Sequence, residues 1–245
     1  MSKFLSQFCR GVASDLRLLA FIHHQELNEE RLEQIESLGL PMEFSLQLSS
    51  KMATEALIIL NHGMADLRQH TPMKLDEHAA DYAAIYLNHG YGISPCESTW
   101  LDEDGLTMQE PMFQVREWYG RFGLAAQDWR IKTDDHLANQ LEFISHLFEQ
   151  GSLQILKEAA QFMDEHILRW VMNFSRQVSG RCATPFYAGA AILTAAYLEE
   201  LRDIQAQLLN SPRPSTEEIE KRMQSGANQQ VEVPLSFTPG AAPGW

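Results

Sequence analysis

Apolar residues recur along this chain at steps of three and four, and that spacing leaves few folds open to it. Near the start the series is Leu5, Phe8, Val12, Leu16 and Leu19. Residues spaced in this way lie on one face of an α-helix, where they can be buried together. The chain also has 30 leucines and 24 alanines but only 6 valines, and β-branched residues are the ones that favour strands. The sequence therefore predicts an all-α protein.

The pattern predicts a single globular helical bundle made of N-terminal and C-terminal parts. Asn28 is placed to cap a short second helix, whose apolar residues are Leu32, Ile35 and Leu38. Glycines and prolines interrupt the pattern between about 88 and 107, so a turn-rich linker should join the two parts. Longer helices are expected at about 50–68, 73–87, 109–121, 133–149, 153–177 and 184–209.

The sequence changes character after Leu209. Residues 210–245 hold five of the chain's 10 prolines and include the stretches NQQ and GAAPGW. A segment of this composition buries too little apolar surface to offset the entropy lost on folding. We therefore expect an all-helical domain over 1–209 and a mostly disordered tail over 210–245, with one or two helical turns around 217–223.

Charge and cysteine content narrow the class of protein. The formal net charge is −14, which disfavours nucleic-acid binding because that needs Lys and Arg to neutralise phosphates. Cys9, Cys96 and Cys182 lie far apart with no CxxC pair, which fits a reducing compartment rather than a disulfide framework. There is neither a signal-peptide core nor an apolar run of about 18 residues. We expect a cytoplasmic protein without stable membrane insertion.

Histidines stand beside acids at Asp76–His78, Asp134–His136 and Asp164–His166. A carboxylate can orient a histidine for acid–base catalysis, but adjacent residues on a helix point in different directions. Such clusters are also typical of solvated helix starts. Glu142 and His146 are four residues apart rather than three as in di-iron bundles, and no glycine-rich phosphate loop is present. The sequence predicts no catalytic residue, no metal and no cofactor.

The helix expected at 133–149 has one apolar and one polar stripe. The apolar stripe is Leu137, Leu141, Ile144 and Phe148, and the polar stripe is Asp135, Asn139, Glu142 and His146. A polar stripe is usually the solvated face of a helix. It gains a functional meaning when another element covers it.

The linker is the natural element to cover the polar stripe. Its apolar side chains are Trp100 and Leu101, and its acids are Glu97, Asp102, Glu103 and Asp104. A groove with both kinds of side chain suits a peptide that carries apolar residues beside arginines, because aromatic burial supplies affinity and carboxylates pair with guanidinium groups. The residues are equally compatible with a Trp100 that belongs to the core and with acids that are merely solvated.

Three segments in this order are similar to the TorD/DmsD/NarJ family of bacterial redox-enzyme maturation chaperones. They are Tyr82–Tyr86 (YAAIY), Pro95–Asp102 (PCESTWLD) and Asp135–Leu137 (DHL). The family pattern is Y-x-x-L-F, a turn-rich linker, P-x-x-E-S-x-[YW]-L, and E-P-x-D-H-[IL] before a leucine-rich helix. The chain departs from it at Ile131–Thr133, where the family has an acid and a proline, and at Cys96, where an aromatic residue is common.

The resemblance implies a non-enzymatic chaperone in the cytoplasm. Such a protein binds the twin-arginine signal peptide, or the body, of a molybdopterin oxidoreductase precursor, aids cofactor insertion and delays export. The resemblance leaves open whether the protein is a monomer or a homodimer, including a domain-swapped one. On this basis the expected peptide site comprises Tyr86, Glu97, Ser98, Trp100, Leu101, Asp102, Asp135, His136, Asn139 and Glu142.

Two other functions stay open. One is a metal-dependent enzyme on a helical bundle, with ligands drawn from Glu142, His146, His78 and His166. The other is a helical adaptor for a different apolar peptide. For the chaperone, Asp135 is expected in the first turn of its helix, where it would contribute about 0.3–1 kcal/mol to stability through the helix dipole.

Overall fold

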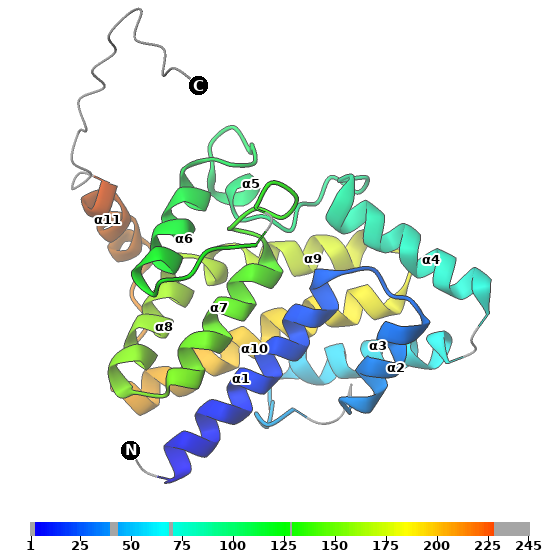
Figure 1. Cartoon of the computed structure of the whole chain (residues 1–245), viewed down its shortest axis with the longest axis horizontal. Helices are drawn as coiled ribbons and strands as arrows, with labels where there is room; N and C mark the ends of the chain where they lie inside the picture. The colour runs from blue at the N-terminus through cyan, green and yellow to red at the C-terminus, as the bar shows by residue number, and fades with distance from the viewer. Residues whose placement is uncertain (1–2, 40–43, 69–70, 128, 228–245) are drawn as a thin grey trace, which may run out of the picture. The chain divides into compact units, whose positions relative to one another are not determined.

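A computed structural model describes residues 3–39, 44–68, 71–127 and 129–227. Every named element in these ranges is helical, which confirms the all-α prediction. The chain divides into two compact units, Met1–Arg213 and Pro214–Trp245. The elements are α1 (Lys3–His24), α2 (Glu29–Ser37), α3 (Lys51–Leu67), α4 (Pro72–Tyr82), the π-helical turn η1 (Ala83–Leu87), α5 (Ser98–Leu101), α6 (Glu110–Arg121), α7 (Leu137–Gln150), α8 (Leu153–Glu165), the 3₁₀ turn η2 (Ile167–Arg169), α9 (Val171–Arg181), α10 (Pro185–Leu209) and α11 (Thr216–Ala227) (Figure 1).

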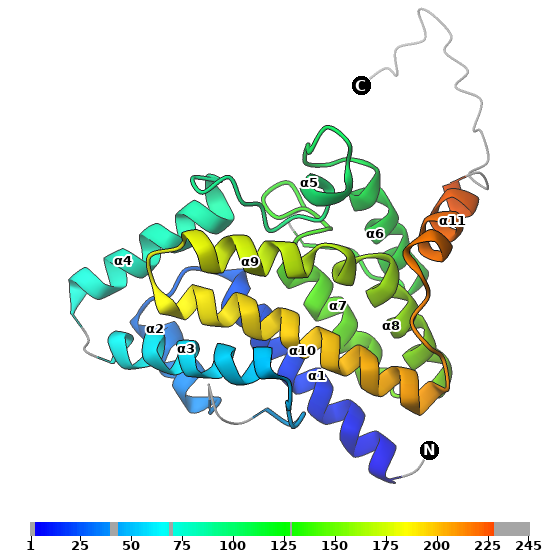
Figure 2. The same cartoon turned by 180° about the vertical axis from the view of Figure 1, so that it is seen from behind.

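Two helix pairs organise the first unit. α1 packs along α7, and α3 packs along α10, whose other side lies against α9 (Figure 2). The core contains large aromatic side chains with no exposed surface, namely Phe148, Phe162, Trp170, Phe174, Phe186, Tyr187 and Tyr197. Each buried ring removes a large apolar area from water, so these residues supply much of the stabilisation of the unit.

Glycines set the close approach of α3 and α10. A Cβ added at Gly63 would lie 2.4 Å from the backbone nitrogen of Phe186, and one added at Gly189 would lie 2.5 Å from that of Leu60. Real Cβ atoms do not approach a backbone atom so closely. Each helix therefore presents a glycine to the backbone of the other.

The helix caps and stripes follow the sequence closely. The side chain of Asn28 accepts a hydrogen bond from the backbone N–H of Arg31 at 2.8 Å, so it caps α2 as predicted. Leu32 and Ile35 are buried, whereas Leu38 is 53% exposed because α2 ends at Ser37. The predicted apolar stripe of α7 is completely buried.

α7 starts at Leu137 rather than at about residue 133, so Asp135 lies outside the helix and not in its first turn. The backbone before α7 is extended and pairs with the linker: Glu97 N–H donates to the Asp135 carbonyl at 3.2 Å, and Leu137 N–H donates to the Pro95 carbonyl at 2.8 Å. His136 becomes the N-cap, and its Nδ1 accepts from Ala138 N–H. Pairing with a distant segment has replaced the first helical turn.

The helix predicted at 153–177 is interrupted at His166. Its backbone leaves the helical region, with φ −123° and ψ −93°, and α8 and α9 are separated there by the turn η2. The break accompanies two long-range contacts of this segment, from His166 to Glu97 and from Asp164 to Arg202 on α10. Tertiary contacts outweigh helix propensity at this point.

The linker and the helix before it also contain structure that the sequence pattern did not predict. The segment Ser98–Leu101 forms the short helix α5 within the linker. The helix expected at 73–87 ends in η1, where Asn88 N–H donates to the Ala83 carbonyl. Such π-helical turns are often found at functional sites, and this one directs Tyr86 inward and leaves Leu87 63% exposed.

The second unit contains α11, which spans 12 residues and is longer than the one or two turns expected. Residues 228–245 of the predicted tail lie outside the described residues. No helix in the described part of the chain has both the length and the apolar character needed to cross a bilayer.

Contacts of residues 211–213 suggest that the helical domain extends slightly past the expected boundary at 209. The guanidinium of Arg213 pairs with the carboxylates of Glu199 and Asp203 on α10, and Arg202 donates to the carbonyls of Ser211 and Pro212. We expect a chain that ends at Arg213 to be about 1 kcal/mol more stable than one that ends at Leu209, since partly exposed pairs of this kind contribute about that much. Urea unfolding of the two truncated chains measures the difference, and equal midpoints would contradict it.

Candidate functional site

The carboxyl group of Asp135 ties the linker to the start of α7. It is fully buried and accepts three hydrogen bonds, from Ser98 N–H at 2.8 Å, from the Ser98 hydroxyl at 2.6 Å and from the Thr133 hydroxyl at 2.6 Å. Both oxygens therefore have partners within the chain. Asp135 and Ser98, which belong to two of the three motifs noted in the sequence, are in direct contact.

Glu97 makes the second contact between the linker and the helices. Its carboxyl group has no exposed surface, and its two oxygens contact His166 Nδ1 at 2.8 Å and Gln140 Nε2 at 2.9 Å. Gln140 also donates to the Asp135 carbonyl at 3.0 Å. One glutamate thus joins the linker, α7 and the break between α8 and α9.

Three further linker residues of the predicted site lie near these contacts. The indole N–H of Trp100 donates to the Ser94 carbonyl at 2.9 Å, and its ring stacks on Trp170 with centroids 6.4 Å apart. Leu101 is partly buried against the core. The Asp102 carboxyl accepts a hydrogen bond from Asp104 N–H at 3.1 Å and so belongs to a local turn.

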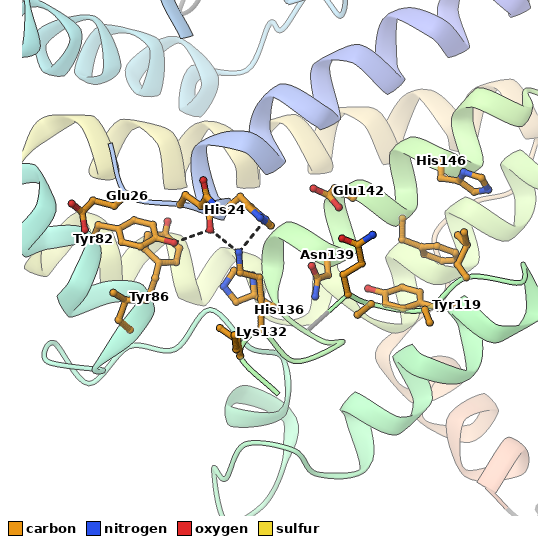
Figure 3. A pocket seen from close by; sticks show the side chains of 18 of the residues that line it. His24, Glu26, Tyr82, Tyr86, Tyr119, Lys132, His136, Asn139, Glu142 and His146 are labelled. Atoms are coloured by element: carbon orange, nitrogen blue, oxygen red, sulfur yellow. Dashed lines mark hydrogen bonds between the residues drawn. The ribbon is translucent and has the colours of Figure 1, made fainter. Parts of the chain in front are cut away.

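A cleft of about 920 Å³ lies beside the Asp135–Leu137 segment, and His136 lines it (Figure 3). Its walls are the end of α1 and the start of α2, the end of α4 with η1, the connection between α6 and α7, and one face of α7. The predicted site residues that line it are Tyr86, His136, Asn139 and Glu142. Three members of the polar stripe, Asn139, Glu142 and His146, therefore line the cleft, whereas Asp135 is hydrogen-bonded to Ser98 of the linker.

Exposed apolar side chains border the cleft. Leu87 is 63% exposed, Leu124 is 36% exposed and Ile131 is 88% exposed, and all three line it. Leaving large apolar side chains in water around a concave site is typical of a surface that binds another molecule.

Lys132 and His24 form a hydrogen-bonded pair inside the cleft (Figure 3). The ammonium group of Lys132 donates to the His24 carbonyl at 2.6 Å and to His24 Nδ1 at 3.0 Å, and Tyr82 O–H donates to the same carbonyl at 2.9 Å. His24 is the last residue of α1, so these donors satisfy a carbonyl that has no partner within the helix. Burial, and the positive charge of Arg31, lower the pKa of Lys132 to about 8.

The histidines next to this pair are neutral. Burial and the nearby charge of Lys132 hold the pKa of His136 well below its usual value. Burial alone lowers the pKa of His23 to about 3, and His23 Nδ1 contacts the Tyr86 hydroxyl at 2.6 Å. The inner wall of the cleft is therefore polar without carrying imidazolium charge.

Two carboxylates contribute negative charge to the cleft. Glu26 and Glu142 are both exposed and both line it, and in Figure 3 they lie on opposite sides of His24. Partial burial raises the pKa of Glu142, and the charge of Lys132 acts against that rise. A second hollow of about 440 Å³ shares His24, Glu142 and His146 with the cleft.

Candidate metal ligands do not gather in the described part of the chain. No group of three His, Cys, Asp or Glu side chains in those ranges is arranged to hold a metal ion. His166 is engaged with Glu97, and His78 Nδ1 contacts the Lys74 carbonyl at 2.7 Å. The metal-enzyme alternative finds no ligand set there.

Several cleft residues had no signal in the sequence. Glu26 and Arg31 lie between or at the ends of helices, and no motif marks them. Lys132 lies in the segment Ile131–Thr133, where the chain departs from the family pattern. They come together only through the packing of α1, α2 and the connection before α7. The one available clue was the polar stripe on α7, which indicated a face that another part of the chain had to cover.

Comparison with known proteins identifies relatives over most of the chain. The chaperone protein TorD of Vibrio cholerae O1 El Tor is 28% identical over 198 residues, which are 74% of this chain and 86% of the relative. TorD of Vibrio vulnificus CMCP6 is 27% identical over 73% of this chain and 87% of its own length. TorD of Aliivibrio fischeri is 25% identical over 71% and 85%. These relatives are named chaperones, not enzymes.

Residues 48–176 match the nitrate reductase delta subunit family. The matched segment is just over half of the chain and includes the three motifs noted in the sequence. On this match, and with curated relatives named TorD, the chain belongs to the nitrate reductase delta subunit family, the TorD/NarJ-type chaperones that its motifs predicted.

Proposed function

We propose that this protein is a cytoplasmic chaperone for the precursor of a molybdopterin oxidoreductase. It binds the twin-arginine signal peptide of that precursor, aids cofactor insertion and delays export until the cofactor is in place. Family membership supports the chaperone role. The observation that carries peptide binding is the cleft of about 920 Å³ beside the Asp135–Leu137 segment.

The cleft has the two kinds of surface that a signal peptide needs. Its apolar border of Leu87, Leu124 and Ile131 suits the apolar stretch of such a peptide. Its carboxylates, Glu26 and Glu142, suit arginine side chains because guanidinium groups pair with carboxylates through two parallel hydrogen bonds.

The residues expected in the peptide site have two roles in this proposal. Tyr86, His136, Asn139 and Glu142 line the cleft and contact the peptide. The linker residues and Asp135 act through their positions: the buried carboxyls of Glu97 and Asp135 fix the segment that carries His136. Ser98, Trp100, Leu101 and Asp102 hold the linker in its observed path.

A synthetic peptide with two adjacent arginines and an apolar stretch should bind, and the same peptide with both arginines changed to glutamine should bind more weakly. The double variant Glu26→Gln/Glu142→Gln should weaken binding of the arginine peptide by about 1.5–3 kcal/mol, roughly tenfold to a hundredfold. Isothermal titration calorimetry measures each affinity.

Glu33→Gln is the matched control, since Glu33 is an exposed glutamate on α2 that does not line the cleft. It removes one carboxylate and should leave the affinity unchanged. Equal affinities for the arginine and glutamine peptides would overturn electrostatic recognition. A preference for arginine that survives in the double variant would place the arginine site outside the cleft.

A further inference from the structure

Arg31 brings a buried positive charge to the wall of the cleft. Arg31 is nine-tenths buried, and its partners are neutral. Nη1 donates to Gln25 Oε1 at 3.0 Å, Nη2 donates to the Phe21 carbonyl, and the guanidinium lies 3.7 Å from the centre of the Phe21 ring. Its Nε has no hydrogen-bond partner among the described residues. Buried arginines are normally paired with an anion, but the partners of Arg31 among the described residues are neutral.

The two imidazoles of the cleft are fixed as N–H donors. Lys132 can only donate, so His24 Nδ1 accepts from it and the ring proton of neutral His24 lies on Nε2. His136 Nδ1 accepts from Ala138 N–H, which places its proton on Nε2 as well. Both rings line the cleft, and their hydrogen bonds within the described residues are made through Nδ1. Each ring therefore has a donor left over.

Lys132 adds an ammonium N–H to this set. Two of its three protons are used by His24, which leaves one free. The negative charge of Glu142 raises the pKa of Lys132, whereas the positive charge of Arg31 lowers it. In Figure 3 the Lys132 side chain reaches His24 through two hydrogen bonds and passes beside His136.

We propose that the centre of the cleft is a binding subsite for an oxyanion of carboxylate or phosphate size. The subsite consists of Lys132, His24 Nε2, His136 Nε2 and the charge of Arg31. These four groups are hydrogen-bond donors or carry positive charge, so an acceptor with negative charge is the complementary ligand. An arginine guanidinium is excluded from the same point for the same reason and belongs at Glu26 or Glu142 on either side.

The oxyanion has two sources that the subsite accommodates equally. One is an acidic side chain within the bound peptide, and this source rests on the proposed function. The other is a free phosphate-bearing molecule, whose binding does not depend on the proposed function. Inorganic phosphate alone, and a pair of arginine peptides that carry aspartate or asparagine beside the arginines, separate the two sources.

The test follows the imidazole resonances of the full chain by NMR while phosphate is added, and measures the affinities of the two peptides by calorimetry. Saturable phosphate-dependent shifts of His24 and His136, or tighter binding of the aspartate peptide, are expected. Lys132→Gln should reduce either response at least tenfold, and Lys132→Arg should restore most of it because charge and donors are kept. Lys157→Gln, at an exposed lysine on α8, removes the same charge elsewhere and should change nothing.

Two results would overturn the subsite. One is the absence of saturation by phosphate together with equal affinity for both peptides. The other is a response in Lys132→Gln equal to that of Lys157→Gln, provided that circular dichroism shows both variants folded. In either case, if the affinity for the arginine peptide still falls in Glu26→Gln/Glu142→Gln, the proposed function stands. The failure of the subsite and the failure of the proposed function are therefore distinguishable.

Discussion

Replacing Asp135 by alanine is expected to destabilise the first unit by about 3–5 kcal/mol, several times the effect of losing a helix-dipole interaction. The carboxyl has no exposed surface and accepts hydrogen bonds from the Ser98 amide, the Ser98 hydroxyl and the Thr133 hydroxyl. Alanine leaves these buried donors without their acceptor, and each unsatisfied group costs about 1–3 kcal/mol. Urea unfolding followed by circular dichroism measures the loss.

Asp76→Ala is the control, because Asp76 is an exposed aspartate on α4 and its removal should change stability by less than about 0.5 kcal/mol. Asp135→Asn keeps the shape and one acceptor oxygen and should fall between the two. If Asp135→Ala unfolds at the same urea concentration as Asp76→Ala, the carboxyl does not hold the linker to α7. The prediction also affects assays of client maturation. A defect in Asp135→Ala would follow from the loss of stability, and so would not by itself show that Asp135 contacts the peptide.

The double variant Gly63→Ala/Gly189→Ala is expected to lose about 2–5 kcal/mol of stability, because each new methyl group would overlap a backbone atom of the facing helix. Helix propensity works in the opposite direction, since alanine is favoured over glycine by about 1 kcal/mol within a helix. The overlap dominates: distances of 2.4 and 2.5 Å to backbone nitrogens can be relieved only by moving α3 away from α10.

Gly180→Ala separates these two effects. Gly180 lies on α9, is exposed, and a Cβ there meets no atom within 4 Å. Alanine at this position should therefore stabilise the protein by about 0.4–1 kcal/mol. Thermal or urea unfolding of both variants checks the opposite signs. A double variant as stable as the wild type would mean that the α3–α10 contact tolerates wider spacing.

Features that depend on neighbouring residues could be predicted from the sequence. The cap at Asn28 and the buried stripe of α7 required only local spacing, because a helix places residues three and four apart on one face. The linker could be placed from its turn residues for the same reason. Its internal helix α5 could not, since four residues of STWL carry no periodic signal.

Features that depend on distant residues could not be predicted in the same way. Asp135 and Glu97 read as acids of a helix start and a solvated loop, yet both are buried because Ser98, Gln140 and His166 reach them from other segments. The family resemblance brought these residues together as motifs without saying which of them face solvent. Burial of a carboxyl depends on partners whose distance in space a sequence does not contain.

The sequence by itself determined that this chain is helical, where most of its helices lie and which face of α7 is buried, because these follow from side-chain spacing along a single helix. The tertiary structure alone decided that the linker is anchored through Asp135 and Glu97. It alone also decided that the cleft forms beside the Asp135–Leu137 segment. It also decided that Glu26, Arg31 and Lys132 meet the polar stripe there. Their convergence depends on how α1, α2 and α7 pack, and packing is a property of several helices at once.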